Sequence, residues 1–287
     1  MKNLDLVSGS WSDYALIDSG DNEKLERFGP IVLARPETQA IWAKREPAEW
    51  SRAVARFKFS GGKGAWEKKK GVPEKWEVGY EGARFTLRLT AVKHIGVFPE
   101  QAANWQWLQE RVAKLSKPKV LNLFGYTGIA SIVAAQAGAQ VTHVDASKQS
   151  NAWAKENAVL SGVPAGGIRY LLDDALKFAQ REGRRGSIYD GIILDPPAFG
   201  RGPQSEVWRI ESDIVPLLKA LAPLLAGKPG AFFLMSGYAA GYSSASFLQV
   251  AQDAFGALPE SGTFGELSIR ESANRVVPSG IYIRFSV

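Results

Sequence analysis

Residues 119–128 constrain the fold of this chain more than any other stretch, and they read Lys-Val-Leu-Asn-Leu-Phe-Gly-Tyr-Thr-Gly. Their apolar first half predicts a buried strand, which passes directly into a turn bracketed by two glycines. Small apolar residues over 129–137 then predict a helix, and an aliphatic strand over 140–145 ends on Asp145. A strand–turn–helix–strand unit of this kind places backbone N–H groups and one carboxylate around a nucleotide-like ligand.

The same alternation of strands and helices continues through the rest of the chain. Strands are predicted near 119–124, 140–145, 168–172, 190–195 and 231–236, and helices near 128–138, 148–161, 174–182, 205–226 and 243–255. The last two strands, 264–270 and 280–287, have no helix between them. We therefore expect an α/β fold with a doubly wound, mainly parallel, seven-stranded sheet of the Rossmann-like kind, with ligands at the carboxyl ends of the strands.

Residues 1–95 predict a smaller, β-rich N-terminal domain. Strands are expected at 14–17 and 30–34 with turn chemistry at 18–22, and further strands over 52–92 with exposed loops at 61–64 and 68–71. A helix over 101–115 follows and leads to Lys117 and Pro118. We expect the domain boundary here, so that residues 96–287 form the main domain and the helix connects the two.

Positive charge and tryptophan gather in the N-terminal part of the chain. Of the net charge of +6, residues 44–93 alone contribute 13 Lys/Arg against 6 Asp/Glu. Six of the nine tryptophans, at positions 42, 50, 66, 76, 105 and 107, lie in or beside this stretch. Basic surface interleaved with aromatic rings suits a polyanion with stackable bases, such as RNA. The alternative is a small β domain with solvated lysines and a tryptophan-built core, and charge alone does not separate the two.

The composition also excludes several kinds of chemistry. The chain has no cysteine, which excludes disulfides, thiolate metal sites and cysteine nucleophiles. Its two histidines, His94 and His143, are far apart, so we expect no histidine-rich metal site, and His143 is predicted to be a core residue rather than a base. No run approaches the roughly 18 apolar residues of a membrane span, and the start lacks a signal-like apolar region. We expect a cytoplasmic protein without a membrane partner or a metal.

The turn after the first main-domain strand and the acids after the next two form a candidate ligand site. Gly125 and Gly128 let the backbone approach a ligand closely at a helix N-terminus, although such a turn can also be purely structural. Asp145 can accept hydrogen bonds from both ribose hydroxyls of an adenosine, or alternatively cap the following helix. Asp174 can accept from an adenine amine or cap its own helix, with Asp173 as a rival. The dinucleotide fingerprint Gly-x-Gly-x-x-Gly is absent.

A second signal follows the strand near 190–195, which ends in Asp-Pro-Pro-Ala-Phe-Gly. The two prolines after Asp195 fix a rigid loop, although a Pro-Pro turn can also merely end a strand. A planar nitrogen substrate can place its N–H groups against Asp195 while stacking on Phe199. Together with the unit over 122–145, this loop favours a class I methyltransferase that uses S-adenosylmethionine (SAM) and accelerates transfer mainly by orientation. The terminal strand pair favours the same class over a dinucleotide dehydrogenase.

The chain resembles the bacterial large-subunit ribosomal RNA methyltransferase I-like group of SAM-dependent enzymes. The matching stretches are 94–101, 122–128, 144–147, 174–175 and 195–202. The resemblance implies that SAM is bound by Phe98, Gln101, Asn122, Phe124, Gly125, Tyr126, Thr127, Gly128, Asp145, Ala146, Asp174 and Ala175. It implies that the acceptor is faced by Asp195, Pro196, Pro197 and Phe199, and that the partner is RNA.

The chain departs from this group in two respects. The best-known members carry an N-terminal RNA-binding PUA domain, and residues 1–80 do not clearly form one. Formation of 5-methylcytosine needs a cysteine nucleophile, whereas this chain has Met235–Tyr238 where one would be expected. Methylation of a base nitrogen, such as guanine N2 or N7, needs no nucleophilic side chain. We therefore expect methylation of a base nitrogen of ribosomal RNA.

Other functions stay open at this level. The same catalytic domain can act on a small molecule or a protein, and an NAD(P)-dependent oxidoreductase or an inactive RNA-binding module are further alternatives. The sequence leaves open the modified nucleotide, its position and the oligomeric state. It also leaves open whether Arg201, Arg270 and Arg275 contact substrate or solvent.

Overall fold

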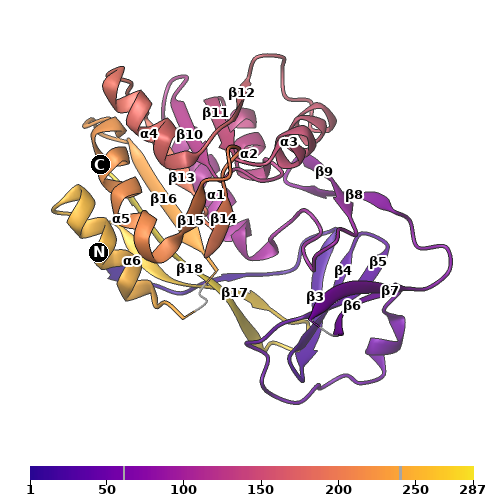
Figure 1. Cartoon of the computed structure of the whole chain (residues 1–287). Helices are drawn as coiled ribbons and strands as arrows, with labels where there is room; N and C mark the ends of the chain where they lie inside the picture. The colour runs from indigo at the N-terminus through magenta and orange to yellow at the C-terminus, as the bar shows by residue number, and fades with distance from the viewer. Residues whose placement is uncertain (61, 239–240) are drawn as a thin grey trace. The chain divides into compact units, whose positions relative to one another are not determined.

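The computed structural model describes residues 1–60, 62–238 and 241–287, which fall into two compact units (Figure 1). The sheet unit comprises residues 1–6, 103–267 and 280–287, and the N-terminal unit comprises residues 7–102 and 268–279. The expected boundary at residues 95 and 96 differs from this division. The reason is long-range pairing: the first residues of the chain pair with a strand near its end, and the tip of the last strand pair bonds to a strand of the N-terminal unit.

Among the described residues, the sheet has nine strands in the order β1–β17–β18–β16–β13–β10–β11–β12, with β2 also paired to β17. Their bounds are β1 Lys2–Asn3, β2 Leu6–Ser8, β10 Lys119–Leu123, β11 Gln140–Asp145, β12 Ile168–Leu172, β13 Gly191–Leu194, β16 Phe232–Gly237, β17 Thr263–Arg270 and β18 Val276–Ser286. Strands β10, β11, β12, β13 and β16 are parallel to their neighbours among themselves, and β18 is antiparallel to β16. All seven predicted strands are present. The predicted number of seven is corrected to nine, because β1 and β2 add to β17.

Helices connect the parallel strands as the alternating pattern predicts. They are α1 Ala102–Val112, α2 Ile129–Gln136, α3 Lys148–Leu160, α4 Ala175–Arg184, α5 Ile210–Leu221 and α6 Ser244–Phe255, with short 3-10 helices η2 Pro99–Gln101 and η3 Ala222–Leu224. Helix α2 packs on α3, whereas α4 packs on α5 and α5 on α6. No helix within the described residues has both the length and the apolar character needed to cross a bilayer.

The predicted helix over 205–226 is wrong at its start. Strands β14 Phe199–Arg201 and β15 Val207–Arg209 form an antiparallel hairpin there, and the helix begins only at residue 210. The β-branched and aromatic residues of β15 suit a strand, and the carboxylate of Asp213 accepts a hydrogen bond from the Arg209 N–H at 2.6 Å, which fixes the helix start.

The interior of the sheet unit is apolar on the face covered by α4, α5 and α6. Side chains of Leu121, Ile192 and Phe233 point into it from three adjacent strands, and each is fully buried. Leu217 and Leu221 of α5 meet them from the helical layer. Burial of a leucine, isoleucine or phenylalanine side chain stabilises the folded state by about 1.5–3 kcal/mol. This cluster therefore fixes which face of each strand is turned toward the helices.

The N-terminal unit is β-rich, as predicted. A five-stranded sheet runs in the order β3–β4–β5–β6–β7, and β8 pairs with β9. The bounds are β3 Tyr14–Gly20, β4 Glu23–Phe28, β5 Ile31–Pro36, β6 Ala55–Ser60, β7 Lys63–Lys68, β8 Lys75–Tyr80 and β9 Ala83–Arg88, with the 3-10 helix η1 Glu49–Arg52. Strand β4 was not predicted, because its charged residues Lys24 and Glu26 are buried in ion pairs that sequence alone does not reveal. Of the loop expected at 61–64, residue 61 lies outside the described residues and residues 63–64 begin β7.

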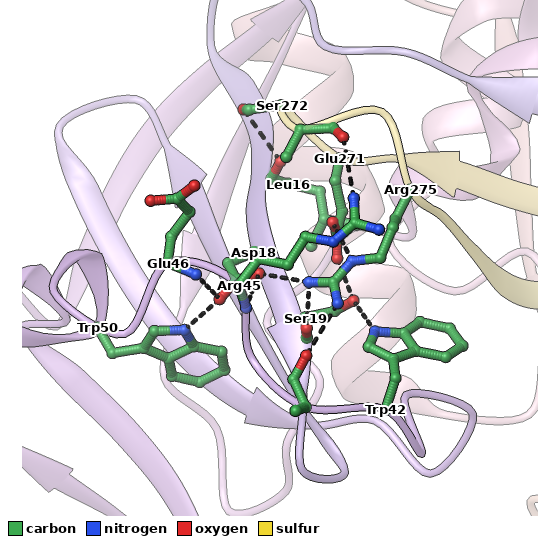
Figure 2. Close-up of polar contacts among 12 residues, drawn as sticks. Leu16, Asp18, Ser19, Trp42, Arg45, Glu46, Trp50, Glu271, Ser272 and Arg275 are labelled. Carbon is green, nitrogen blue, oxygen red and sulfur yellow. Dashed lines mark hydrogen bonds and ion pairs between the residues drawn. The ribbon is translucent and has the colours of Figure 1, made fainter.

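A buried charge cluster ties segment 268–279 into the N-terminal unit (Figure 2). The guanidinium of Arg275 donates to Asp18 at 2.6 Å, to Glu271 at 2.8 Å and to the carbonyls of Ser19 at 2.7 Å and Ala43 at 2.9 Å. Asp18 and Glu271 are 0% and 2% exposed. The geometry matches the fork of donors that arginine offers to carboxylates, so Arg275 is a structural residue of this cluster.

Asp18 is the acceptor on which the cluster converges. The Trp50 indole donates to it at 2.8 Å, and the backbone N–H groups of Arg45 and Glu46 donate at 3.3 and 3.1 Å. Burial acts to raise the pKa of Asp18, but the hydrogen bonds from Trp50 and the backbone, together with the Arg275 charge, hold the pKa below its ordinary value of 3.8. The ionised carboxylate is therefore stabilised by folding.

We predict that Arg275→Met destabilises the protein by about 3–5 kcal/mol, because two buried carboxylates lose their counter-charge. Urea unfolding followed by circular dichroism measures this loss. The exposed Arg270, on β17, gives the matched control Arg270→Met, which should change stability by less than about 0.5 kcal/mol. Because the pKa of Asp18 is lowered on folding, its contribution is full above pH 3.8 and is lost as the pH falls through the lower folded value. Equal stability of the two variants would contradict the assignment.

Candidate active site

The register of the parallel strands brings the predicted site residues to one edge of the sheet. Leu123 is paired with Val144 on one side and with Leu194 on the other, and Leu194 is paired with Met235. The residues that follow these strand positions therefore emerge side by side at the carboxyl edge. They are Phe124, Asp145, Asp195 and Ser236.

The glycine turn between β10 and α2 is held in an uncommon backbone conformation. Phe124 and Tyr126 have φ angles of 54° and 48°, in the left-handed region that non-glycine residues rarely adopt. The Gly125 N–H donates to the Val144 carbonyl at 3.1 Å, and the Tyr126 N–H donates to the Asp145 carboxylate at 2.8 Å. These bonds to β11 offset the cost of the conformation, which is on the order of 1–3 kcal/mol per residue.

Gly128 is the N-cap of α2, at the point where this helix closely approaches α3. Its φ is 83°, and a Cβ added there would lie 2.8 Å from the Cβ of Ala154. The carbonyl of the buried Thr127 accepts from the Asn157 side chain of α3 at 2.9 Å. Glycine is therefore required at 128 by backbone conformation and by packing together.

Asp145 joins the glycine turn to the next loop. One carboxylate oxygen accepts from Tyr126 and the other accepts from the Ser147 N–H, both at 2.8 Å. Ser147, not Asp145, caps α3, since its hydroxyl accepts from the Ser150 N–H at 3.1 Å. Burial raises the pKa of Asp145 above its ordinary value, and the two backbone hydrogen bonds oppose this shift. Each carboxylate oxygen keeps a second lone pair with which to accept from a ligand.

A buried polar network supports the turn from below. Asn122 donates to the Ser131 hydroxyl at 2.8 Å, and that hydroxyl lies 2.9 Å from Nδ1 of His143. A Cβ on Gly125 would lie 2.3 Å from the His143 ring, so the turn rests directly on the imidazole. Burial lowers the pKa of His143 to about 4, so the ring is neutral at pH 7. His143 is a core residue, as predicted, and Asn122 directs its amide nitrogen into the protein.

The acids after β12 act as helix-capping groups. Asp174 is the N-cap of α4 and accepts from the Lys177 N–H at 2.9 Å, while Ala175 is buried in the first turn. Asp173 accepts from the Asp174 N–H and pairs with Arg181. The cap role of Asp174 is confirmed, and it leaves one carboxylate oxygen for a ligand. Ala146, between Asp145 and the cap of α3, is half-buried.

The loop after β13, residues 195–199 (the reactive loop), holds the Asp195 carboxyl group, whose pKa is raised. Burial raises the pKa of Asp195 to about 6, although a hydrogen bond from Ser236 acts to lower it. Ser236 is 3% exposed and lies in β16, at the position where the sequence lacks the expected cysteine. Pro196 is buried, and Pro197 and Phe199 are exposed. A carboxyl group whose pKa lies near neutral can accept or donate a proton in catalysis.

Trp208 connects the reactive loop to the glycine turn. Its indole N–H donates to the Pro197 carbonyl at 2.7 Å, and its ring centroid lies 4.8 Å from that of Phe124. On the same hairpin, the guanidinium of Arg209 lies 5.5 Å from the ring centroid of Phe199, which is 53% exposed. Sequence reasoning missed Trp208 because it fell inside a wrongly predicted helix. Ser236 was missed because only the pairing of β13 with β16 places it beside Asp195.

Phe98 and Gln101, also predicted to bind the cofactor, lie in the N-terminal unit. Phe98 precedes the 3-10 helix η2, and its ring centroid is 5.1 Å from that of His94. Gln101 ends η2, and its N–H donates to the Phe98 carbonyl at 3.1 Å. Their role at the cofactor site stays a prediction.

The mainly parallel sheet with its antiparallel terminal pair, and the acids and glycines at one edge, define a nucleotide-binding α/β protein of the class I methyltransferase kind. Residues 33–242 match the family described as S-adenosylmethionine-dependent methyltransferase. The match covers most of the chain, and the chain therefore belongs to the SAM-dependent methyltransferase family. The NAD(P)-dependent alternative is set aside.

Known relatives agree with this assignment. A SAM-dependent methyltransferase from Agrobacterium tumefaciens is 41% identical with a TM-score of 0.93, over 99% of this chain and 93% of that one. A methyltransferase structure complexed with SAH is 20% identical with a TM-score of 0.73, over 96% of this chain and 75% of that one, which shows the fold alone. A ribosomal RNA large subunit methyltransferase K/L from Pseudoalteromonas atlantica is 34% identical over 79% of this chain. The chain spans only 31% of the length of that relative.

The residues present fit SAM. Gly125 and Gly128 stand where any side chain would collide with the protein, so no side chain at these positions keeps a ligand from the backbone of the turn. The Asp145 carboxylate keeps acceptor capacity for ribose hydroxyls. Asp195 lies at the same edge of the sheet, because Leu194 pairs with Leu123.

We predict that Gly125→Ala destabilises the protein by about 1–3 kcal/mol, because the new Cβ overlaps the buried His143 ring. Thermal or urea unfolding measures this. Gly183→Ala in α4 is the control: nothing lies within 4 Å of its Cβ, and it should be neutral or stabilising. In a double-mutant cycle, His143→Ala should relieve part of the cost of Gly125→Ala. Additive losses would show that the ring is not what excludes the side chain.

Proposed function

We propose that this chain transfers the methyl group of SAM to a base nitrogen of ribosomal RNA. The observation that carries the proposal is the loop from Asp195 to Phe199, which joins an acid poised near neutral pH to a rigid backbone and an exposed ring. This set of groups suits a planar N–H substrate, since it offers an acceptor for the N–H and a face for the ring. The relatives named as ribosomal RNA large subunit methyltransferases support RNA as the acceptor.

We assign the cofactor contacts as follows. Asp145 accepts hydrogen bonds from the ribose hydroxyls, and the free oxygen of Asp174 accepts from the adenine amine. The backbone from Phe124 to Gly128 lines the remainder of the cofactor, and Ala146 and Ala175 leave room beside the two acids. Asn122 acts indirectly, through Ser131 and the helix that carries it.

Bound SAM would supply a sulfonium-activated methyl group for transfer to the acceptor nitrogen. Asp195 accepts the hydrogen bond from the acceptor N–H and takes the proton as positive charge develops on the nitrogen. Phe199 stacks on the base and fixes its plane, with Arg209 behind the ring. The target base must be unstacked to reach this loop.

The basic N-terminal unit supports an RNA acceptor over a small molecule. Residues 44–93 hold 13 Lys/Arg against 6 Asp/Glu, and polyanions bind such surfaces through counterion release. We propose that this unit grips the RNA while the sheet unit modifies the base. A small metabolite would need no such surface.

We predict that Asp145→Ala weakens SAM binding at least about tenfold, because the ribose hydroxyls lose their acceptor and the Tyr126 N–H loses its own. Isothermal titration calorimetry with SAM measures the affinity. Asp253→Ala, an exposed acid on α6, is the control and should leave the affinity unchanged. Wild-type affinity in the Asp145 variant would place the ribose elsewhere.

We predict that methyl transfer requires ionised Asp195, so that the rate falls as the pH drops through about 6. Removing the hydrogen bond that lowers this pKa, by Ser236→Ala, should move the acidic limb of the profile to higher pH. Asp195→Ala should abolish transfer while SAM binding persists. A profile that is flat from about pH 5 to pH 8 would remove Asp195 from the mechanism.

The function itself is tested by transfer of tritium from labelled SAM to undermodified total RNA, followed by nucleoside analysis. Label in an N-methylated guanine or adenine, absent with Asp195→Ala, is the expected result. Label in a carbon-methylated pyrimidine would overturn the base-nitrogen assignment. If RNA acquires no label although SAM still binds, RNA is excluded as the acceptor, and a protein or a small molecule is tested in its place.

A further inference from the structure

The hairpin of β6 and β7, residues 55–68, holds four Lys/Arg against one Glu and lies within a longer basic stretch of the chain. Residues 52–75 hold eight Lys/Arg and two Asp/Glu, a net charge of +6, which equals the net charge of the full chain. The hairpin lies at one edge of the five-stranded sheet, because β7 pairs with β6 and ends the strand order (Figure 1). The charges outside residues 52–75 therefore sum to zero, and the net positive charge of the chain comes from this stretch.

Several of these lysines are free to meet an external anion. Within the described residues, the exposed side chains of Lys63, Lys68 and Lys70 have no carboxylate within ion-pair distance. Lys58 in contrast pairs with Glu67 at 2.9 Å. The unpaired ammonium groups repel one another, so a bound polyanion would stabilise them.

The hairpin also presents an aromatic ring to solvent. Phe59 is 66% exposed, although an apolar side chain of this size is normally buried in a sheet. Its ring packs edge-to-face on the buried Phe57 at 5.3 Å between centroids, and Phe57 packs in turn on Trp66 at 5.3 Å. Gly64 stands opposite Phe59, and a Cβ there would lie 2.3 Å from the Phe57 ring. The exposed ring is thus held on a rigid aromatic support.

The tryptophans that drew attention in the sequence do not offer such a ring. Trp50 and Trp76 are 7% and 8% exposed. Indole N–H groups of Trp42, Trp50, Trp66 and Trp76 are all bonded within the N-terminal unit. These residues build the unit, and among its described residues Phe59 is the large aromatic side chain that is exposed.

Protection of a sheet edge explains only part of this surface. Lysines on an edge strand discourage pairing with other chains. An exposed phenylalanine opposes this protection, because its apolar surface favours association with other chains. The combination of free lysines with a supported, exposed ring is instead what binds single-stranded nucleic acid, with phosphates on the lysines and a base on the ring.

We infer that the β6–β7 hairpin is a binding site for single-stranded RNA, in which Phe59 stacks on a base and Lys63 and Lys68 contact the adjoining phosphates. The inference rests on the proposed function for the choice of RNA. It adds a second RNA-binding site to that function, because the nucleotides bound at the hairpin are not the nucleotide that is methylated. The site reads no sequence, since every base offers a face to the ring.

The test is binding of the full chain to a fluorescein-labelled oligouridylate of about 12 nucleotides, followed by fluorescence anisotropy over a range of salt concentrations. Phe59→Ala should weaken binding about tenfold, and Phe59→Trp should retain it. Lys63→Gln/Lys68→Gln should weaken binding and reduce the slope of log affinity against log salt by about 1.4, since two phosphate contacts are lost.

Matched controls separate the hairpin from the charge and apolar surface of the whole protein. Lys114→Gln/Lys219→Gln removes the same net charge from exposed positions of the sheet unit and should leave binding nearly unchanged. Ile41→Ala truncates a side chain of the N-terminal unit that is 80% exposed and lies outside the hairpin. SAM affinity and the unfolding curve of each variant establish that it folds, which is expected because Phe59 contributes little to the core.

Failure of this inference is distinct from failure of the proposed function. Wild-type binding by Phe59→Ala, equal loss in both lysine pairs, or no binding of the oligouridylate by the wild type would overturn the hairpin site. In each case tritium transfer to RNA could still occur. Binding that depends on Phe59 in a protein that methylates no RNA would retain the site and overturn the acceptor.

Discussion

The parallel register of β10 with β11 and β13 is the constraint on which the site depends. It sets the ends of three strands level, so that a glycine turn, Asp145 and Asp195 emerge together although 50 residues separate the two acids. Backbone hydrogen bonds fix this register, and the buried aliphatic side chains on both faces prevent a slip, because a shift by one residue would turn every side chain to the opposite face. Any chemistry at this edge inherits its geometry from the ladder.

The cofactor turn shows how local strain is supported by buried polar groups. Two residues with left-handed backbone angles are held by Asp145 above and by the imidazole of His143 below. The neutral histidine and its partners Ser131 and Asn122 are buried, so water does not compete for their hydrogen bonds. Pre-organisation of this kind fixes the backbone of the turn before a ligand arrives.

The N-terminal unit follows a different principle, in which buried charges rather than apolar area fix the connection of distant segments. Arg275 and Glu271 come from the end of the chain and Asp18 from its beginning, and a single guanidinium satisfies both carboxylates (Figure 2). Such a cluster tolerates no missing partner, because each remaining charge would be buried alone. The surface of the same unit uses charge in the opposite way, since Lys63 and Lys68 of the β6–β7 hairpin are exposed and have no carboxylate partner among the described residues.

The sequence by itself determined the alternation of strands and helices, the cofactor class and the acids at the strand ends, because these follow from local periodicity and from turn chemistry at fixed spacing. It placed β11 and β12 at their observed bounds. It did not reveal β4, whose charged residues are paired only in three dimensions, or the β14–β15 hairpin that carries Trp208. Only the tertiary structure decided that Ser236 meets Asp195, that Arg275 is structural, and that Phe59 rather than a tryptophan faces solvent. Each of these depends on contacts between residues far apart in the chain, and a linear pattern contains no record of such contacts.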